Sequence, residues 1–333
     1  MKTTLYACYD FKKSPITFDI CNFLCLAEAH RLEHGFDRLH LVTVPGPHQG
    51  FRDKGVVSDE SKQWRLRNII NDCAWLVPSC QNVTNFYSRE EANIFLNRMG
   101  ACTFPEGYDV LSSPIPKYNW KHINNASDQG KDLQFLSAGP EAKKIIGRWL
   151  KKTAGLKKVV TVTLRQTEYE TARNSNVDQW EHFLSSLDQN IYFPVIVPDF
   201  DYGFSSSDCF SNEICVLPHV VWDVELRSAL YEMSYLNFFI NNGTTTLGYF
   251  NRKVNLIIMK WVVEEVRVTS SSFLLDEMGF KAGQTPKFFG KLQKLCWEDD
   301  VVENIDREFK IMVEKIETSK QNDFEQISST APV

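Results

Sequence analysis

The sequence predicts an α/β protein with two Rossmann-like domains that face a cleft. In both halves of the chain, apolar strand-like segments alternate with helical segments, which indicates crossover units of a parallel sheet. Residues 104–138 separate the two series and are rich in Pro, Asn, Ser and Asp without sustained periodicity, as an interdomain linker would be. We therefore expect a first domain over 1–138, a second over 139–317 and a mobile polar tail over 318–333.

The alternating segments of the first domain give three strands and three helices. Ser58 is a plausible N-cap, with Asp59 and Glu60 in the first helical turn, and Ser88 and Gly100 bracket another helix. Strands are expected at 4–9, 39–44 and 82–87, and helices at 18–34, 58–76 and 89–99.

The second domain repeats the alternation. Gly139 and Pro140 begin a helix, because proline is tolerated in the first turn, and Gly155 ends it. Strands are expected at 157–165, 192–197, 213–217, 237–240 and 254–259, and helices at 141–153, 177–187, 224–235 and 301–316, with a turn of helix after Gly243.

The composition fits a globular protein and excludes several classes. Of the 333 residues, 43% are hydrophobic and 24% are charged. The net charge of -5 argues against a nucleic-acid partner, because such proteins carry a strongly basic surface. The nine cysteines lack the spacing of a zinc site, the N-terminus lacks the apolar core of a signal peptide, and no apolar run could span a membrane. We therefore expect a cytoplasmic protein.

A polar loop that directly follows the apolar run 159–164 is the strongest candidate for a ligand site. It contains Arg165, Arg173 and Asn174. Open α/β sheets bind ligands at the carboxyl ends of their strands, and arginine forks match phosphate or carboxylate oxygens. This pattern predicts an anion site. The alternative is that both arginines pair with Glu168 and Glu170 on the surface.

Two further loops leave strand ends in the same domain. Asn242, Gly243 and Thr244 follow an apolar strand and could cradle a second part of the anion, although the same residues also form ordinary turns and caps. Asp199 could accept hydrogen bonds from a sugar hydroxyl or a base. With Asp201 it forms a DxD pair, a pattern that can bind a metal-diphosphate but is common by chance.

Candidates for a general base lie in the first domain. Asp10 follows the first strand, and the glycine-rich loop after the second strand contains His48 and Asp53. Arg52 in that loop could hold an acceptor or a diphosphate. A loop rich in glycine and proline also needs no catalytic reason to exist. The sequence has no GxGxxG after its first strand, no GxxxxGK[ST], no GxSxG and no HExxH, which excludes the simplest redox, P-loop, esterase and zinc-protease chemistries.

The second half resembles the nucleotide-sugar domain of GT-B-fold glycosyltransferases of bacterial surface-polysaccharide synthesis and, more distantly, the fucosyltransferase-like group. The resemblance covers about residues 157–316. It is carried by 163–165, 173–175, Trp180, Phe183, 195–199, 226–231, 241–243 and 296–300. In the fucosyltransferase-like group a His-x-Arg pattern places an arginine on the donor diphosphate, and here Thr163 replaces that histidine.

This resemblance implies transfer of a sugar from a nucleotide-sugar donor to a glycan or lipid-linked acceptor, in surface polysaccharide or lipopolysaccharide synthesis. It implies no metal and no other cofactor, and a lipid-linked acceptor would bring the protein to the inner face of the membrane. The donor site would comprise Arg165, Arg173, Asn174, Asp199, Asn242, Gly243 and Thr244; the base would be Asp10, His48 or Asp53; and Arg52 would hold the acceptor.

Two other functions fit the same scaffold. A nucleotide-sugar epimerase or hydrolase would change the donor without an acceptor, whereas a transferase releases nucleotide in proportion to acceptor. A non-catalytic nucleotide- or sugar-binding module would bind without turnover.

Overall fold

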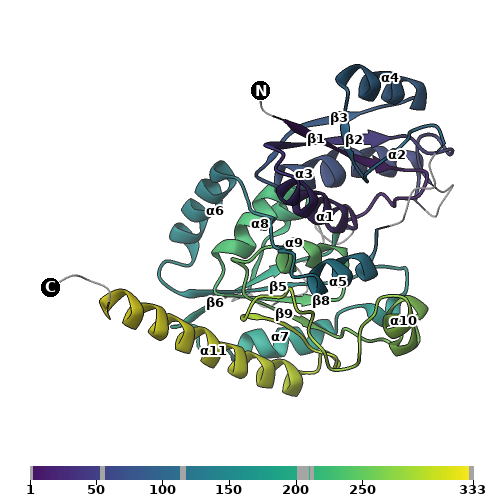
Figure 1. Cartoon of the computed structure of the whole chain (residues 1–333). Coiled ribbons are helices and arrows are strands. Elements are labelled where there is room, and N and C mark those ends of the chain that lie inside the picture. Colours follow the sequence, from purple (N-terminus) through teal and green to yellow (C-terminus); the bar gives the residue numbers. More distant parts are fainter. Residues whose placement is uncertain (1–2, 53–56, 113–117, 201–209, 211–213, 330–333) are drawn as a thin grey trace.

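The computed structural model describes residues 3–52, 57–112, 118–200, 210 and 214–329, with side chains as far as residue 322. It contains two parallel β-sheets with helices packed against them, one above the other in Figure 1. The predicted class, two Rossmann-like α/β domains, is confirmed. Asp53 and Asp201 lie outside the described residues.

The first sheet has the strand order β3-β2-β1-β4, and all three pairings are parallel. Its strands are β1 (Thr4–Asp10), β2 (Arg38–Val44), β3 (Cys80–Asn85) and β4 (Cys102–Phe104). Helix α1 (Ile20–Glu33) follows β1, and α4 (Arg89–Met99) begins at Ser88, whose side chain accepts from the Glu91 N–H at 3.1 Å as expected of an N-cap.

The second sheet has the order β10-β9-β8-β5-β6-β7, again entirely parallel. Its strands are β5 (Lys158–Thr163), β6 (Tyr192–Val197), β7 (Cys215–Val216), β8 (Leu236–Ile240), β9 (Leu256–Met259) and β10 (Gln293–Leu295). The chain builds outward from β5 to β7 and then returns to place β8 on the other side of β5. This reversal makes the β5–β8 boundary a topological switch point, where doubly wound sheets open a crevice for ligands.

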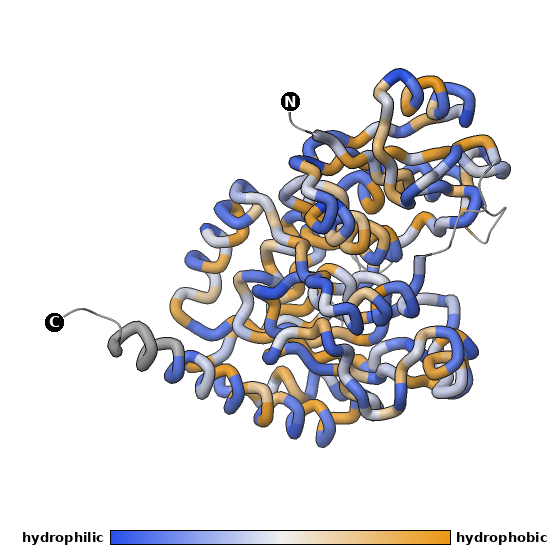
Figure 2. Tube along the Cα trace, in the orientation of Figure 1, coloured by the Kyte–Doolittle hydropathy of each residue, from blue (hydrophilic) through white to orange (hydrophobic). Residues whose placement is uncertain are grey.

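Helices cover both faces of the second sheet, which explains why its central strands are predominantly apolar. Val160, Val162 and Phe238 pack against α7 (Val177–Ser186) and α11 (Val302–Ser329). The alternate residues Val159 and Phe239 face α6 (Pro140–Thr153) and α8 (Val224–Met233). Along α11, apolar and polar positions alternate in Figure 2, as in a helix with one buried face.

The two halves share one hydrophobic core. A continuous cluster of buried apolar side chains runs from α1 and the first sheet to α8 and the second sheet. Residues 104–138, predicted to be a linker, contain α5 (Trp120–Asp128), which Asn119 caps. Trp120 packs against Tyr249 and Phe280 of the second half, with ring centroids 5.1 and 4.9 Å apart. The division at 138/139 stays a prediction.

Several elements differ from the sequence-based expectation. The helix predicted over 58–76 consists of α2 (Asp59–Arg65), a π-helical segment (Leu66–Asn71) and α3 (Asp72–Trp75). Helix α11 continues to Ser329, so residues 317–329 extend the helix beyond the end predicted at residue 316. Two short edge strands, β4 and β10, and helix α10 (Ser271–Asp276) were not expected, whereas α9 (Thr246–Tyr249) confirms the turn of helix expected after Gly243.

None of the described helices has the length and apolar character required to cross a membrane. Of the described cysteines, none forms a disulfide, and most are buried.

Candidate functional site

A cavity of about 290 Å³ lies where the carboxyl edges of the two sheets face each other. The lining residues lie in the loops and helices that follow strands of the two sheets, because both sheets are parallel and both present their carboxyl edges to this space. The volume is near the lower end of the range of about 300–1,000 Å³ typical of small-molecule sites. The lining residues are Thr17, Phe18, Ser61, Trp64, Arg65, Asn68, Ile69, Arg165, Thr167, Arg173, Asp199, Phe200, Val221, Val224, Arg227, Asn242, Gly243 and Thr244.

The described lining of this cavity is strongly cationic. It contains four arginines, Arg65, Arg165, Arg173 and Arg227, and a single carboxylate, Asp199. Arginine keeps its charge at any working pH and presents a planar fork of donors. This part of the molecule therefore matches an anion with several oxygens.

Arg165 is buried and organises the loop that follows β5. Its guanidinium donates to the carbonyls of Tyr169 and Glu170 at 2.9 and 3.1 Å and to Oδ1 of Asn174 at 2.5 Å. Burial, together with the neighbouring charge of Arg173, lowers the pKa of Arg165. The guanidinium thus holds the loop in shape and contributes a fixed positive charge to the cavity wall.

Arg173 is held by the same loop. It pairs with the Glu170 carboxylate at 2.7 Å and donates to the Asn241 carbonyl at 2.9 Å, while its Nε is buried with no partner among the described residues. Glu170 has a φ of 50°, a left-handed conformation that is unusual for a residue other than glycine. Such conformations cluster at functional sites, where surrounding contacts maintain them. The pairing of Arg173 with Glu170 is the alternative that the sequence left open, but it occurs at the cavity wall.

Asn174 and Asp199 brace this wall. Oδ1 of Asn174 also accepts from the Thr167 N–H at 3.2 Å, and its Nδ2 donates to the Thr167 carbonyl at 2.8 Å, so it supports the loop without lining the cavity. Asp199 accepts from the backbone N–H groups of Gln166 and Phe200 at 2.9 and 2.7 Å. Its carboxylate thereby joins the loops after β5 and β6.

The turn after β8 forms the opposite side of the switch point. Oδ1 of Asn242 accepts from the N–H and the hydroxyl of Thr244, at 3.1 and 2.7 Å. A Cβ built on Gly243 would lie 3.5 Å from Cβ of Phe18, an ordinary contact, and Gly243 does not have a positive φ. The backbone here therefore does not demand glycine, and the turn packs against the first domain through Phe18.

Arg227 was not nominated from the sequence. It sits in the first turns of α8 and is only 5% exposed, yet it lines the cavity. Its Nε donates to the Tyr231 hydroxyl at 2.9 Å, and Tyr231 in turn bonds Thr163 at 2.7 Å. Its two terminal nitrogens have no acceptor among the described residues. The position of Arg227 in a helix that follows a strand could have indicated a site residue. A single arginine in an amphipathic helix is, however, not distinguishable by sequence from an ordinary surface residue.

The first domain supplies the remaining wall of the cavity through α2 and the π-helical segment that follows it. Trp64 packs against Phe200 from the second domain with ring centroids 4.8 Å apart and planes tilted by 51°, and Asn68 donates to the Trp64 carbonyl at 2.8 Å. π-helical turns are rare and frequently mark functional sites. Here the wider turn brings Asn68 and Ile69 to the cavity.

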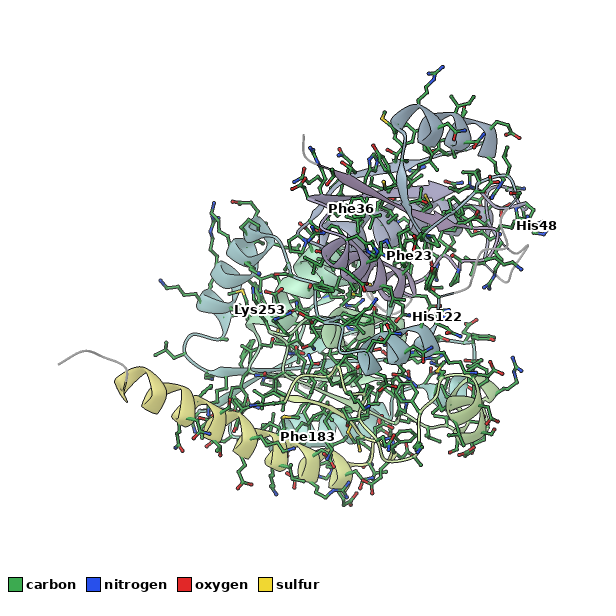
Figure 3. The ribbon with its side chains drawn as sticks, in the orientation of Figure 1. Phe23, Phe36, His48, His122, Phe183 and Lys253 are labelled. Atoms are coloured by element: carbon green, nitrogen blue, oxygen red, sulfur yellow. The ribbon has the colours of Figure 1, made fainter. Side chains whose placement is uncertain are left out.

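The base candidates lie elsewhere. Asp10 is fully buried, and its two oxygens accept four hydrogen bonds, from Arg89 at 3.0 and 2.7 Å, Tyr108 at 2.6 Å and the Lys12 N–H at 2.8 Å. His48 lies at the outer edge of the first domain and borders a separate cavity (Figure 3). Arg52 donates to the Lys13 carbonyl at 3.4 Å and does not line the central cavity. Neither Asp10 nor His48 lines it either.

A larger cavity, of about 620 Å³, lies beside β4 in the first domain. Its described lining includes His30, His34, Glu106 and Asp109 and contains no arginine or lysine. For an anionic ligand this charge pattern is unfavourable, so charge rather than volume selects the smaller cavity.

The two doubly wound sheets and the cation-lined cavity between their carboxyl edges define the architecture of a two-domain α/β protein. An ADP-heptose lipopolysaccharide heptosyltransferase II from E. coli is similar to this chain, with a TM-score of 0.54 and 8% identity, over 95% of this chain and 99% of that one. A glycosyl transferase family 9 protein from Veillonella parvula is similar with a TM-score of 0.50 and 11% identity, over the same shares. No family model and no curated protein sequence matches the chain. The fold is therefore GT-B-like.

Proposed function

We propose that this protein is a glycosyltransferase that moves a sugar from a nucleotide-sugar donor to a glycan or lipid-linked acceptor. The observation that carries the proposal is the arginine-lined cavity at the switch point of the second sheet, facing a second Rossmann-like domain. The GT-B-like fold supports the same function. Synthesis of a surface polysaccharide or lipopolysaccharide is the setting that we propose for it.

The chemistry of sugar transfer fits this cavity. The bond between the anomeric carbon and the diphosphate breaks, and its electron pair goes to the diphosphate oxygen. The acceptor hydroxyl oxygen forms the new bond to that carbon and loses its proton to a base. Fixed cations that face the leaving diphosphate stabilise the charge that develops on it. Transfer would then need no metal or other cofactor.

We assign the diphosphate to the cationic wall. The two terminal nitrogens of Arg227 have no acceptor among the residues that the structure describes, and they would bind phosphate oxygens in a bidentate way. Arg165 and Arg173 supply fixed charge from the braced loop, and Asn242 to Thr244 form the facing turn. Asp199 remains a proposed contact to a donor hydroxyl or base. Because Arg89 and Tyr108 bind the carboxylate of Asp10, we do not propose Asp10 as the base that deprotonates the acceptor. We leave that base unassigned.

Arg227→Ala tests the donor site. We expect nucleoside diphosphate binding to weaken about tenfold to a hundredfold, because a hydrogen bond to a charged group contributes about 1.5–3 kcal/mol. Calorimetry with the nucleotide selected by a thermal-shift screen of UDP, GDP, ADP, CMP and dTDP sugars measures it. Arg227→Lys should recover part of the affinity, and Arg98→Ala, at an exposed arginine of α4, is the matched control. Equal affinity in wild type and a folded Arg227→Ala protein would refute the assignment.

Product analysis with the selected donor separates the alternatives. A transferase releases nucleotide in proportion to added acceptor. An epimerase or hydrolase alters the donor with no acceptor present, and a binding module leaves it intact.

We also propose contact with the cytoplasmic face of an anionic membrane through α6 and the turn that follows it. Residues 140–158 contain seven basic residues and one acidic residue in a chain of net charge -5. Arg148, Lys151 and Lys152 are exposed and have no ion pair among the described residues. The apolar Leu156 beside them is fully exposed. A basic surface with exposed apolar side chains suits the interface of an anionic bilayer.

A further inference from the structure

The last turn of α1 carries two imidazoles and a carboxylate outside the proposed donor site. His30 and His34 are four residues apart, so they share one face of the helix, and Glu33 lies beside them. Their ligand atoms all lie within 4.8 Å of one another. The two imidazole rings are stacked, with centroids 4.0 Å apart and an angle of 29° between their planes.

The hydrogen bonding of His34 leaves one ring nitrogen available. Its Nδ1 lies 3.0 Å from the His30 carbonyl oxygen, which can only accept, so Nδ1 carries the proton. Nε2 then has a free lone pair. Histidines that bind metals have this arrangement, because a backbone carbonyl that accepts from the other nitrogen fixes the tautomer and the orientation of the ring.

The surroundings favour a cation over an anion. His30 and His34 border the cavity of about 620 Å³, whose other titratable lining includes Glu106 and Asp109 but no lysine or arginine among the described residues. Glu33 pairs with Lys131 at 2.6 Å, and both side chains are substantially exposed. Exposed ion pairs contribute about 0–1 kcal/mol, so a metal ion can displace this one.

We propose that His30, Glu33 and His34 form a site for a divalent cation of zinc type. Two histidines at this spacing on a helix are a zinc-binding pattern, and imidazole with carboxylate suits Zn²⁺ rather than Mg²⁺ or Ca²⁺. A tetrahedral zinc site places ligand atoms about 3.3 Å apart. Small rotations of these partly exposed side chains reach that spacing. His30 and His34 both border the cavity, so water from it would complete the coordination.

The site is separate from the proposed donor cavity, since the two cavities share no lining residue. Metal binding here would rigidify the C-terminal end of α1. Because the two sites are separate, metal binding can be tested independently of sugar transfer.

Zinc titration of tag-free, chelator-treated protein tests the proposal. We expect one equivalent of Zn²⁺ to bind by calorimetry and one equivalent of Co²⁺ to give visible d–d absorption bands. His34→Ala and His30→Ala should each weaken binding at least tenfold, and Glu33→Gln should weaken it less. His182→Ala, at an exposed histidine of α7, should have no effect.

Circular dichroism checks that the variants fold, and His34→Gln provides a second variant that keeps a polar side chain. Excess Mg²⁺ should not compete, and nucleotide binding should be the same with and without zinc. Absence of saturable zinc binding, or zinc binding that His34→Ala and His34→Gln leave unchanged, would overturn the proposal.

Discussion

At the scale of single residues, the sequence predicted the position of the cationic loop but not the separate structural roles of its side chains. Arg165, Arg173, Asp199 and the turn at Asn242 all reach one cavity, because strand-end polarity is visible in the sequence. The sequence did not single out Arg227, because its proposed role in ligand binding depends on terminal nitrogens that have no acceptor among the described residues. The distinction between an arginine that shapes a loop and one that faces a ligand exists only in three dimensions.

Arg165→Ala should therefore affect stability and binding together. Removing the guanidinium leaves the carbonyls of Tyr169 and Glu170 with one donor each, the Thr167 hydroxyl and the Arg173 N–H, and losing hydrogen bonds to a charged group costs about 1.5–3 kcal/mol. We expect a lower Tm and nucleotide affinity reduced at least tenfold, whereas Arg227→Ala should reduce affinity with a smaller change in Tm. Arg165→Lys should rescue neither fully, because an ammonium lacks the planar fork. Unchanged nucleotide affinity by calorimetry in a folded Arg165→Ala protein would argue against its role.

At the scale of secondary-structure elements, long apolar strands and capped helices were predictable, and short edge elements were not. β5 and β6 are buried on both faces, which gives continuous apolar runs. β10 has three residues, Gln293 to Leu295, and no such run. Helix α5 was missed because its stability comes from packing of Trp120 rather than from a clear pattern in a polar segment.

Helices α3 and α8 meet at a group of carboxylates that should make stability depend on pH. Burial, and then the charges of Asp223 and Glu225, raise the pKa of Asp72 to about 6 from its ordinary value of 3.8. The folded state then holds this proton more tightly than the unfolded state does. Stability from this group is therefore present below about pH 4 and declines as pH rises to about 6.

The Asp72→Asn substitution should remove this loss of folding stability at higher pH. Above pH 6 we expect the variant to be more stable on the order of 1 kcal/mol, allowing for solvent screening of a half-buried carboxyl, or about 2–4 °C in Tm. Near pH 4 the two proteins should converge. Thermal unfolding across this range measures it, with Asp276→Asn at an exposed position as the control. A gain of the same size at pH 4 and pH 7 would contradict the electrostatic explanation.

At the scale of the whole molecule, alternation of strands and helices predicted two Rossmann-like domains, but not how closely they join. Apolar residues of both halves form one core, and periodicity cannot show which helix faces which domain. Charge is also unevenly distributed. The basic exposed face of α6 belongs to a chain whose overall charge is negative, and only the structure shows that these lysines share a face.

This uneven charge leads to a prediction for membrane binding. The protein should sediment with vesicles containing phosphatidylglycerol and not with pure phosphatidylcholine vesicles. Each basic residue near an anionic surface contributes about 1 kcal/mol. The double variant Lys151→Glu/Lys152→Glu should thus bind at least tenfold more weakly, with Arg98→Glu as the control on another helix. Equal binding to both kinds of vesicle, or no effect of the double variant, would count against the α6 surface.

The contacts of Trp120 have a consequence for how this architecture can be recombined. Because α5 precedes the expected boundary in the chain but packs its tryptophan among Tyr249, Trp261 and Phe280, the covalent order and the packing order of the two halves do not coincide. A chimera joined at residue 138 would separate Trp120 from the three aromatic side chains that it packs against. Exchange of the second half between proteins of this fold would therefore have to transfer residues 118–138 together with the second sheet.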